Sequence, residues 1–164
     1  MRILGIDPGS SVTGFGVIAI EGGRLSLVEA GALRLKKSEH LPLRLREAAD
    51  RLGEVIARHR PDEACLETVF QHLNVRSALV LAHVRGALMV ELTRGGIPLH
   101  EYTPLEIKKA LVGYGHADKE QVRVMVGKLL RLRTLPRPTD VSDALAVAVC
   151  HAHVRAVRRR WEGS

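Results

Sequence analysis

Residues 3–18 read Ile-Leu-Gly-Ile-Asp-Pro-Gly-Ser-Ser-Val-Thr-Gly-Phe-Gly-Val-Ile. A short apolar run ends in a carboxylate, Asp7, and a Pro-Gly-Ser-Ser turn leads into a second apolar run spaced by Gly14 and Gly16. The pattern predicts a tight hairpin of two central strands, with the acid at the carboxyl end of the first. An acid in an apolar run is destabilising unless a cation, a hydrogen bond or solvent compensates it. An isolated Asp-Pro-Gly is also a common turn cap, so both interpretations of Asp7 stay open at this point.

Composition and charge favour a folded protein with a polyanionic partner. The chain has 164 residues, of which 46% are hydrophobic, enough for one domain with a sizeable core. Lys and Arg number 25 against 18 Asp and Glu, a net charge of +7. Nucleic acid is favoured over a membrane because no amphipathic anchor, spanning segment or signal-like pattern is evident. Cys65 and Cys150 stand in unrelated contexts and predict buried thiols in a cytoplasmic protein.

Hydrophobic spacing, turn residues and caps predict an α/β fold. The first three strands form an antiparallel meander whose third strand spans residues 25–35. The later elements are expected in the order helix 42–59, strand 64–69, helix 74–94, strand 97–102, helix 103–112, helix 118–132 and helix 139–159. The result is a five-stranded mixed sheet, the antiparallel three-strand meander plus two parallel strands, flanked by helices. We expect a single domain over residues 1–158 and a short basic tail over 159–164.

Four carboxylates are expected at one edge of this sheet. A right-handed crossover makes the first strand parallel to the strand that carries Glu67, so Asp7 and Glu67 meet where open α/β sheets place their sites. Asp140 and Asp143 share one face at the start of the last helix, although Asp140 is equally well explained by the helix dipole. Converging carboxylates repel each other unless one is protonated or a cation lies between them. Oxygen ligands suit Mg²⁺ or Mn²⁺, and a basic protein with such a pocket fits two-metal phosphodiester hydrolysis with Asp7 as the bridging ligand.

Four stretches together resemble the RuvC family of bacterial Holliday-junction resolvases, from about Arg2 to His153. They are the opening Gly-Ile-Asp-Pro-Gly-Ser-Ser-Val-Thr-Gly-Phe-Gly-Val, Leu-Glu-Thr-Val-Phe around Glu67, Val-Gly-Tyr-Gly-His-Ala-Asp-Lys at 112–119, and Asp-Val-Ser-Asp-Ala-Leu-Ala at 140–146. The resemblance implies an RNase H-like fold and a homodimeric crossover junction endodeoxyribonuclease. It implies nicking of two opposed strands of a four-way DNA junction in recombination and repair. Two Mg²⁺ ions per site, replaceable by Mn²⁺, and the branch-migration proteins RuvA and RuvB as partners are implied with it. The family's catalytic and metal-binding acids fall on Asp7, Glu67, Asp140 and Asp143.

Three further residues are candidates for DNA binding by the same resemblance. Phe70, just past Glu67, is placed to stack on an unpaired base, although a core phenylalanine closing the strand is the commoner case. Lys108 and Lys119 match family lysines near the scissile phosphate, although solvated helix lysines are the simpler interpretation. The helix of residues 74–94 is apolar on more than one face, which suggests a subunit interface.

Three alternatives remain at this stage. The opening hairpin also resembles the phosphate loop of actin-like sugar kinases and chaperone ATPases, but these need two such domains. A non-catalytic DNA-binding module would gain little from a carboxylate cluster that repels phosphates. Another RNase H-like nuclease, acting on RNA or on other branched DNA, is excluded only by substrate assays. His151 and His153 are two apart on a helix and point to different faces, which argues against a metal site formed by this pair.

Overall fold

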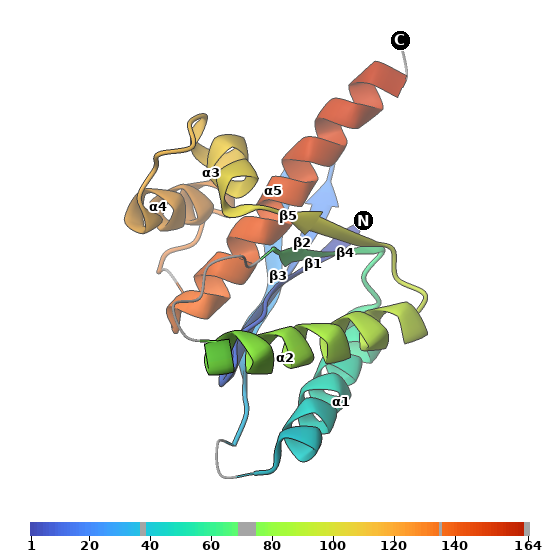
Figure 1. The fold of residues 1–164 in the computed structure, drawn as a ribbon. Helices are drawn as coiled ribbons and strands as arrows, with labels where there is room; N and C mark the ends of the chain where they lie inside the picture. Colours follow the sequence, from blue (N-terminus) through green and yellow to red (C-terminus); the bar gives the residue numbers. More distant parts are fainter. Residues whose placement is uncertain (37–38, 69–74, 135, 163–164) are drawn as a thin grey trace.

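A five-stranded mixed sheet in the order β3-β2-β1-β4-β5 carries helices on both faces (Figure 1). The computed structural model describes residues 1–36, 39–68, 75–134 and 136–162. The strands are β1 (Arg2–Asp7), β2 (Val12–Glu21), β3 (Arg24–Arg34), β4 (Glu63–Glu67) and β5 (Leu99–Tyr102). The helices are α1 (Leu41–His59), α2 (Val75–Arg94), α3 (Pro104–Val112), α4 (Lys119–Leu129) and α5 (Thr139–Glu162).

The two faces of the sheet are buried under different helices. Helices α3, α4 and α5 lie on one side, with α5 running along the sheet, and α1 and α2 cover the other (Figure 1). Side chains alternate between the two faces along each strand. On β1, Ile3 belongs to the core under α5, whereas Leu4 and Ile6 belong to the core under α1 and α2. Asp7 follows Ile3 by an even number of residues and therefore shares the α5 face.

The predicted sheet is confirmed. β1 pairs antiparallel with β2 and parallel with β4, β2 pairs antiparallel with β3, and β4 pairs parallel with β5. The capping box predicted at Thr103 is present: its hydroxyl accepts from the backbone N–H of Glu106 at 3.2 Å, and the Glu106 carboxylate accepts from the backbone N–H of Thr103 at 2.8 Å. Cys65 and Cys150 are buried free thiols, as expected.

Glycines let α5 approach the central strands closely. A Cβ atom added to Gly5 would lie 2.2 Å from the carbonyl oxygen of Ala144, and one added to Gly14 would lie 2.0 Å from that of Asp140. Neither distance is possible for a real side chain, so only glycine allows the backbone of α5 to lie directly on β1 and β2. The glycine spacing of the opening stretch therefore sets the position of the last helix.

Most predicted element ends agree with the structure to within one residue, and the larger differences have local causes. β5 begins at Leu99 rather than at residue 97, because the N–H of Ile97 donates to the carbonyl of Leu92 and closes the end of α2. α4 ends at Leu129 rather than at 132, because Arg131 adopts a left-handed conformation and the Leu132 N–H turns back to Gly127. α5 continues to Glu162, three residues past the predicted end. The cap predicted at Asn74 and the strand end predicted at Val69 lie outside the described residues.

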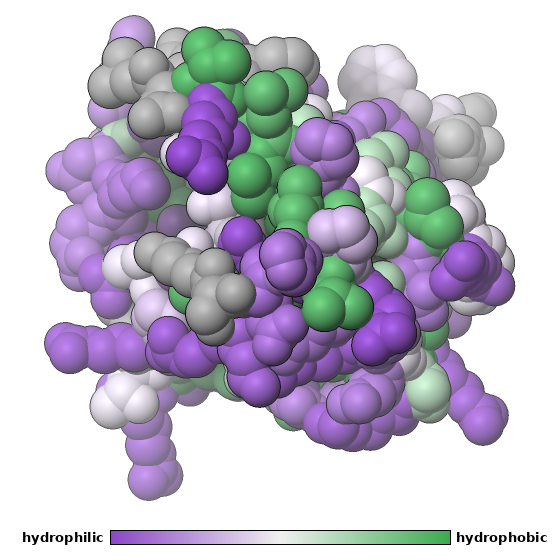
Figure 2. Space-filling view, turned by 60° about the horizontal axis from the view of Figure 1, so that its bottom comes forward, coloured by the Kyte–Doolittle hydropathy of each residue, from purple (hydrophilic) through white to green (hydrophobic). Residues whose placement is uncertain are grey.

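Helix α2 leaves large apolar side chains in solvent. Val75, Leu79 and Val90 are 76%, 56% and 52% exposed, while Leu81, Val84, Leu88 and Leu92 of the same helix are buried. Figure 2 brings the α1 and α2 side of the molecule forward and shows a band of hydrophobic residues bordered by hydrophilic ones. In the described part of the chain, no helix combines the length and apolarity needed to cross a membrane.

Candidate active site

The parallel pairing of β1 and β4 brings Asp7 and Glu67 together. The last partners in the register are Ile6 and Leu66, and each acid follows one residue later, as the last residue of its strand. Neighbouring strands lie about 4.8 Å apart, so the two carboxylates leave the same sheet edge as neighbours. The right-handed crossover predicted from the sequence places Asp7 and Glu67 side by side in the same way.

The first turn of α5 supplies the other two acids. Gly14 is the register partner of Asp7 on β2, and the backbone of Asp140 lies directly against Gly14. Asp143 follows one turn later on the helix face that meets the sheet. A single pocket is lined by all four acids, Asp7, Glu67, Asp140 and Asp143. The structure thus brings together the four predicted carboxylates.

The turn that follows Asp7 forms one wall of the pocket, and hydrogen bonds to residues outside the pocket wall stabilise it. The backbone N–H of Gly9 donates to the hydroxyl of Thr13, a fully buried residue, at 3.3 Å. The guanidinium of Arg44, from α1, donates to the carbonyl of Ser10. These contacts fix the loop whose residues Pro8 to Val12 line the pocket. Sequence reasoning missed Arg44 because the contact spans 34 residues and no local pattern indicates it.

Burial and mutual repulsion make it unfavourable for the acids to ionise. Burial raises the pKa of Asp7 from its ordinary 3.8 to about 8, and three carboxylates add to the rise. In order of effect these are Glu67, Asp143 and Asp140. Burial also raises the pKa of Glu67 and of Asp143. In the absence of a cation, Asp7 therefore holds a proton at neutral pH.

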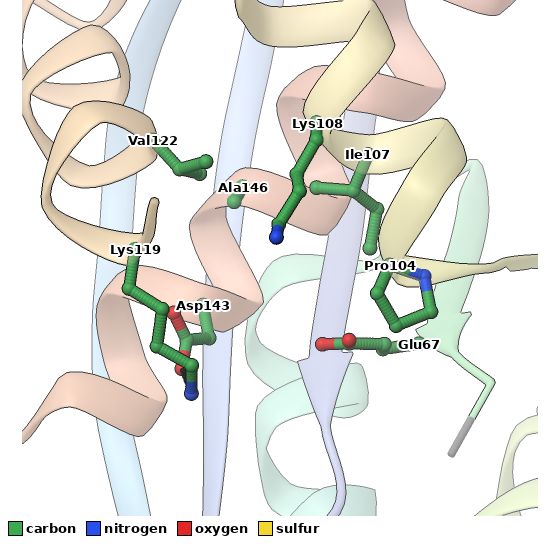
Figure 3. Close-up of a pocket in the computed structure, with 8 residues that line it drawn as sticks. All are labelled: Glu67, Pro104, Ile107, Lys108, Lys119, Val122, Asp143 and Ala146. Atoms are coloured by element: carbon green, nitrogen blue, oxygen red, sulfur yellow. Dashed lines mark ion pairs between the residues drawn. The ribbon is translucent and has the colours of Figure 1, made fainter. Parts of the chain in front are cut away.

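Two lysines reach into the site from α3 and the start of α4. Lys108 and Lys119 line a second pocket that shares Glu67, Lys119 and Asp143 with the first (Figure 3). The ammonium of Lys119 lies 3.8 Å from the Asp143 carboxylate and lowers the pKa of Asp7, Glu67 and Asp143. Lys108 lowers that of Glu67. The structure therefore places both predicted lysines beside the acids, at the mouth of a groove that can accept an anion.

The donor set fits a hard divalent cation. The described residues that line the carboxylate pocket offer acidic oxygens but neither histidine nor cysteine. Mg²⁺ and Mn²⁺ prefer such oxygen ligands. A cation at this point would offset the repulsion that raises the pKa of Asp7.

A cluster of a glutamate and two histidines lies outside the carboxylate pocket. The sequence did not reveal a cluster of Glu63, His100 and His151, whose ligand atoms lie within 4.8 Å of one another. Sequence spacing relates His151 only to His153, whereas its partners in the structure come from β4 and β5. No sequence spacing indicates such a cluster. Phe70 lies outside the described residues.

A family model described as crossover junction endodeoxyribonuclease RuvC matches residues 3–151. The chain belongs to the RuvC family. The RuvC of Halorhodospira halophila is 52% identical over 94% of this chain and 92% of that protein. The RuvC of Burkholderia thailandensis is 50% identical over 93% of this chain and 84% of that protein. The Thermus thermophilus RuvC structure superposes with a TM-score of 0.90 at 34% identity and covers 96% of both chains.

RuvC membership agrees with the observed sheet. The five-stranded mixed sheet flanked by helices is the RNase H-like fold of the solved RuvC structures. A second Thermus thermophilus structure is described as RuvC in complex with Holliday junction substrate and has a TM-score of 0.91. As a RuvC-family nuclease, the protein belongs to a class that uses a divalent metal.

Proposed function

We propose that this protein resolves four-way DNA junctions by paired symmetric nicks, in homologous recombination and repair, and that residues 1–158 form its nuclease domain. The observation that carries the proposal is the meeting of Asp7, Glu67, Asp140 and Asp143 in one pocket, in a chain of the RuvC family. The net charge of +7 fits a polyanionic substrate.

The four acids would hold two Mg²⁺ ions, with Mn²⁺ able to replace them. When bound, the ions activate the attacking water and stabilise the leaving oxygen. Asp7 is the best candidate to contact both ions, because it lies on the central strand between β4, which ends in Glu67, and Gly14 of β2, against which Asp140 packs. Arg44 acts as a positioning residue, since it holds the turn that follows Asp7.

Lys108 and Lys119 would bind the phosphate at the cut. Both border the groove beside the acids, and cations there hold the DNA backbone and offset negative charge that develops in the transition state. Phe70 would stack on an unpaired base at the junction centre.

The symmetric substrate is best matched by a symmetric dimer. A four-way junction has near-twofold symmetry, so two copies related by a twofold axis place one site at each of two opposed strands. The exposed apolar residues Val75, Leu79 and Val90 make α2 the candidate interface. RuvA and RuvB are the expected partner proteins, and the cytoplasm is the expected location.

Cleavage of a synthetic mobile four-way junction tests the function. With Mg²⁺ we expect paired symmetric nicks, and none with a chelator. Asp7→Asn should bind the junction and leave it uncut, because an amide keeps the shape but loses the charge that holds the ions. The matched control Asp50→Asn changes an exposed acid of α1 and should cut as the wild type does.

Parallel substrates separate this function from its nearest alternative. A linear duplex, other branched DNA and an RNA–DNA hybrid are offered under the same conditions. Equal cutting of the linear duplex would contradict junction selectivity. Preferential cutting of the hybrid or of another branched DNA would instead support a different RNase H-like nuclease.

A further inference from the structure

A second cluster of potential ligands lies where β4, β5 and α5 meet. Glu63 begins β4, His100 belongs to β5 and His151 is buried in α5. The Nε2 atom of His151 lies 2.5 Å from Glu63 Oε2, and the Nε2 atom of His100 lies 3.9 Å from the same oxygen. The two imidazole rings stack with their centroids 4.4 Å apart. All three side chains thus converge on one point.

This cluster is separate from the four carboxylates. Glu63 and Glu67 are the two ends of β4, about 13 Å apart at the usual rise of a strand. His151 follows Asp143 by eight residues along α5, about 12 Å at the rise of a helix. Along both β4 and α5, the cluster and the carboxylate site are therefore separated by about the same distance. The two sites lie at opposite ends of β4.

The surroundings orient these side chains as ligands. The other ring nitrogen of His151, Nδ1, lies 2.7 Å from the hydroxyl of Tyr102. Arg155 Nε forms an ion pair with the second Glu63 oxygen, Oε1, at 3.2 Å, while Oε2 is the oxygen that contacts the histidines. Metal-binding histidines typically donate their other ring N–H to such a partner. With an ion on Nε2, His151 would therefore carry its proton on Nδ1 and donate it to the Tyr102 hydroxyl, the reverse of the metal-free hydrogen bond.

We propose that Glu63, His100 and His151 bind a transition-metal ion of the Zn²⁺ class. Two imidazoles and one carboxylate are a common zinc ligand set, with water in the fourth position. Ligand atoms on one Zn²⁺ ion lie about 3.3 Å apart. The two distances to Glu63 Oε2 lie on either side of this value, and all three ligand atoms are within 4.8 Å of one another, so side-chain adjustments would complete the site. The His100 side chain is 32% exposed and leaves an entry path. The bound ion would join β4, β5 and α5 away from the nuclease centre.

His100 distinguishes a metal site from a purely hydrogen-bonded cluster. Glu63, His151 and Tyr102 form a complete chain of hydrogen bonds, in which Tyr102 and His151 donate in turn. His100 Nε2 is too far from Glu63 for a hydrogen bond, but the gap suits an ion between them. Loss of His100 should therefore remove metal affinity and leave that chain intact.

Zn²⁺ titration of the metal-stripped full-length protein tests the proposal. It is done in competition with a chromophoric chelator and in saturating Mg²⁺, which occupies the carboxylate site. We expect one Zn²⁺ per chain, retained in Asp7→Asn, and a rise in melting temperature on binding. His100→Ala should weaken binding at least about tenfold and lose the rise. Tyr102→Phe should weaken it about 10–100-fold, as loss of a histidine's outer partner does.

The control is His83→Ala, which removes an exposed imidazole from α2 and should bind Zn²⁺ as the wild type does. Co²⁺ in place of Zn²⁺ should give the visible absorption of a tetrahedral site in the wild type and in His83→Ala, but not in His100→Ala. The proposal is overturned if His100→Ala binds Zn²⁺ as tightly as the wild type, or if Asp7→Asn abolishes binding. Junction cleavage by His100→Ala reports separately on the nuclease function.

Discussion

Asp7 destabilises the metal-free protein because the folded state favours a proton that the unfolded chain gives up. Its pKa rises from 3.8 to about 8 on folding, chiefly through burial. Between these two values the folded protein binds more protons than the unfolded chain, so the free energy of unfolding falls as pH rises through that window. Below the lower value both states are protonated and the effect vanishes. A residue proposed to bind the catalytic ions thus opposes stability.

Asp7→Asn should stabilise the metal-free protein at pH 8 by up to about 5 kcal/mol and change little well below pH 3.8. The amide is neutral at every pH and avoids the buried charge. Urea unfolding in chelator at both pH values measures the difference. Addition of Mg²⁺ should stabilise the wild type and not the variant. An Asp7→Asn protein that is no more stable than the wild type at pH 8 would refute this explanation.

Lys119→Ala should move the pH–activity profile upward by on the order of half a unit. Lys119 lowers the pKa of Asp7, Glu67 and Asp143, so its removal makes all three harder to ionise. The shift is modest because the Lys119 side chain is 84% exposed and its charge is screened by water. Cleavage rates across pH at subsaturating Mg²⁺ measure it. Lys109→Ala, an exposed lysine of α3, is the control, and an equal shift there would count against a specific role for Lys119.

At the scale of elements, the site depends on how closely α5 lies against the hairpin of β1 and β2. Gly5 and Gly14 remove the side chains that would separate them, and Asp140 lies over Gly14 as a result. β1 and β4 place their acids by register alone, whereas the α5 acids are placed by this packing. The geometry of the four carboxylates is therefore sensitive to a single methyl group between helix and strand.

Gly14→Ala should destabilise the protein by about 2–4 kcal/mol and abolish cleavage, because the new methyl group would overlap the carbonyl of Asp140 and lift the start of α5. Urea unfolding and junction cleavage measure the two effects. Gly53→Ala in α1 is the matched control, since its new methyl group meets only the mobile end of Glu91 and alanine favours the helix by about 1 kcal/mol. A Gly14→Ala protein with wild-type stability and activity would show that the close packing is unnecessary.

At the scale of the whole molecule, three surfaces have different chemistry. The carboxylate groove with its two lysines lies at the carboxyl ends of β1 and β4, and the Glu63–His100–His151 cluster lies at the other end of β4. Helix α2, which carries the exposed apolar residues, lies on the opposite side of the sheet from α5 (Figure 1). Its Leu81 also lines the carboxylate pocket, so the proposed interface helix borders the nuclease site.

Leu79→Glu should convert the proposed dimer to monomer, because it places a charge in the exposed apolar face of α2. Sedimentation velocity measures the change in mass. Junction cleavage should lose its paired nicks, since a monomer carries one site. Val157→Glu, at an exposed position of α5, should leave mass and cleavage unchanged. A Leu79→Glu protein that remains dimeric would place the interface elsewhere.

Local patterns in the sequence determined the elements and the sheet order. Hydrophobic period, turn residues and caps act over a few residues, and the handedness of the crossover then makes Asp7 and Glu67 neighbours. The Thr103 capping box follows from residues three apart. These predictions hold because each depends on interactions close along the chain or on a general rule of chain geometry.

The tertiary structure alone decided how closely the parts approach. The start of β5 was set by Ile97 closing α2, the turn after Asp7 by Arg44, and the pKa of Asp7 by burial among groups from other elements. The contact between Glu63 and His151 joins residues 88 apart. Distances and burial of this kind arise from packing of whole elements, which residue spacing along one chain does not encode. The sequence identified the four acids, and the packing of whole elements determined their burial, their distances from one another and the rise in the pKa of Asp7.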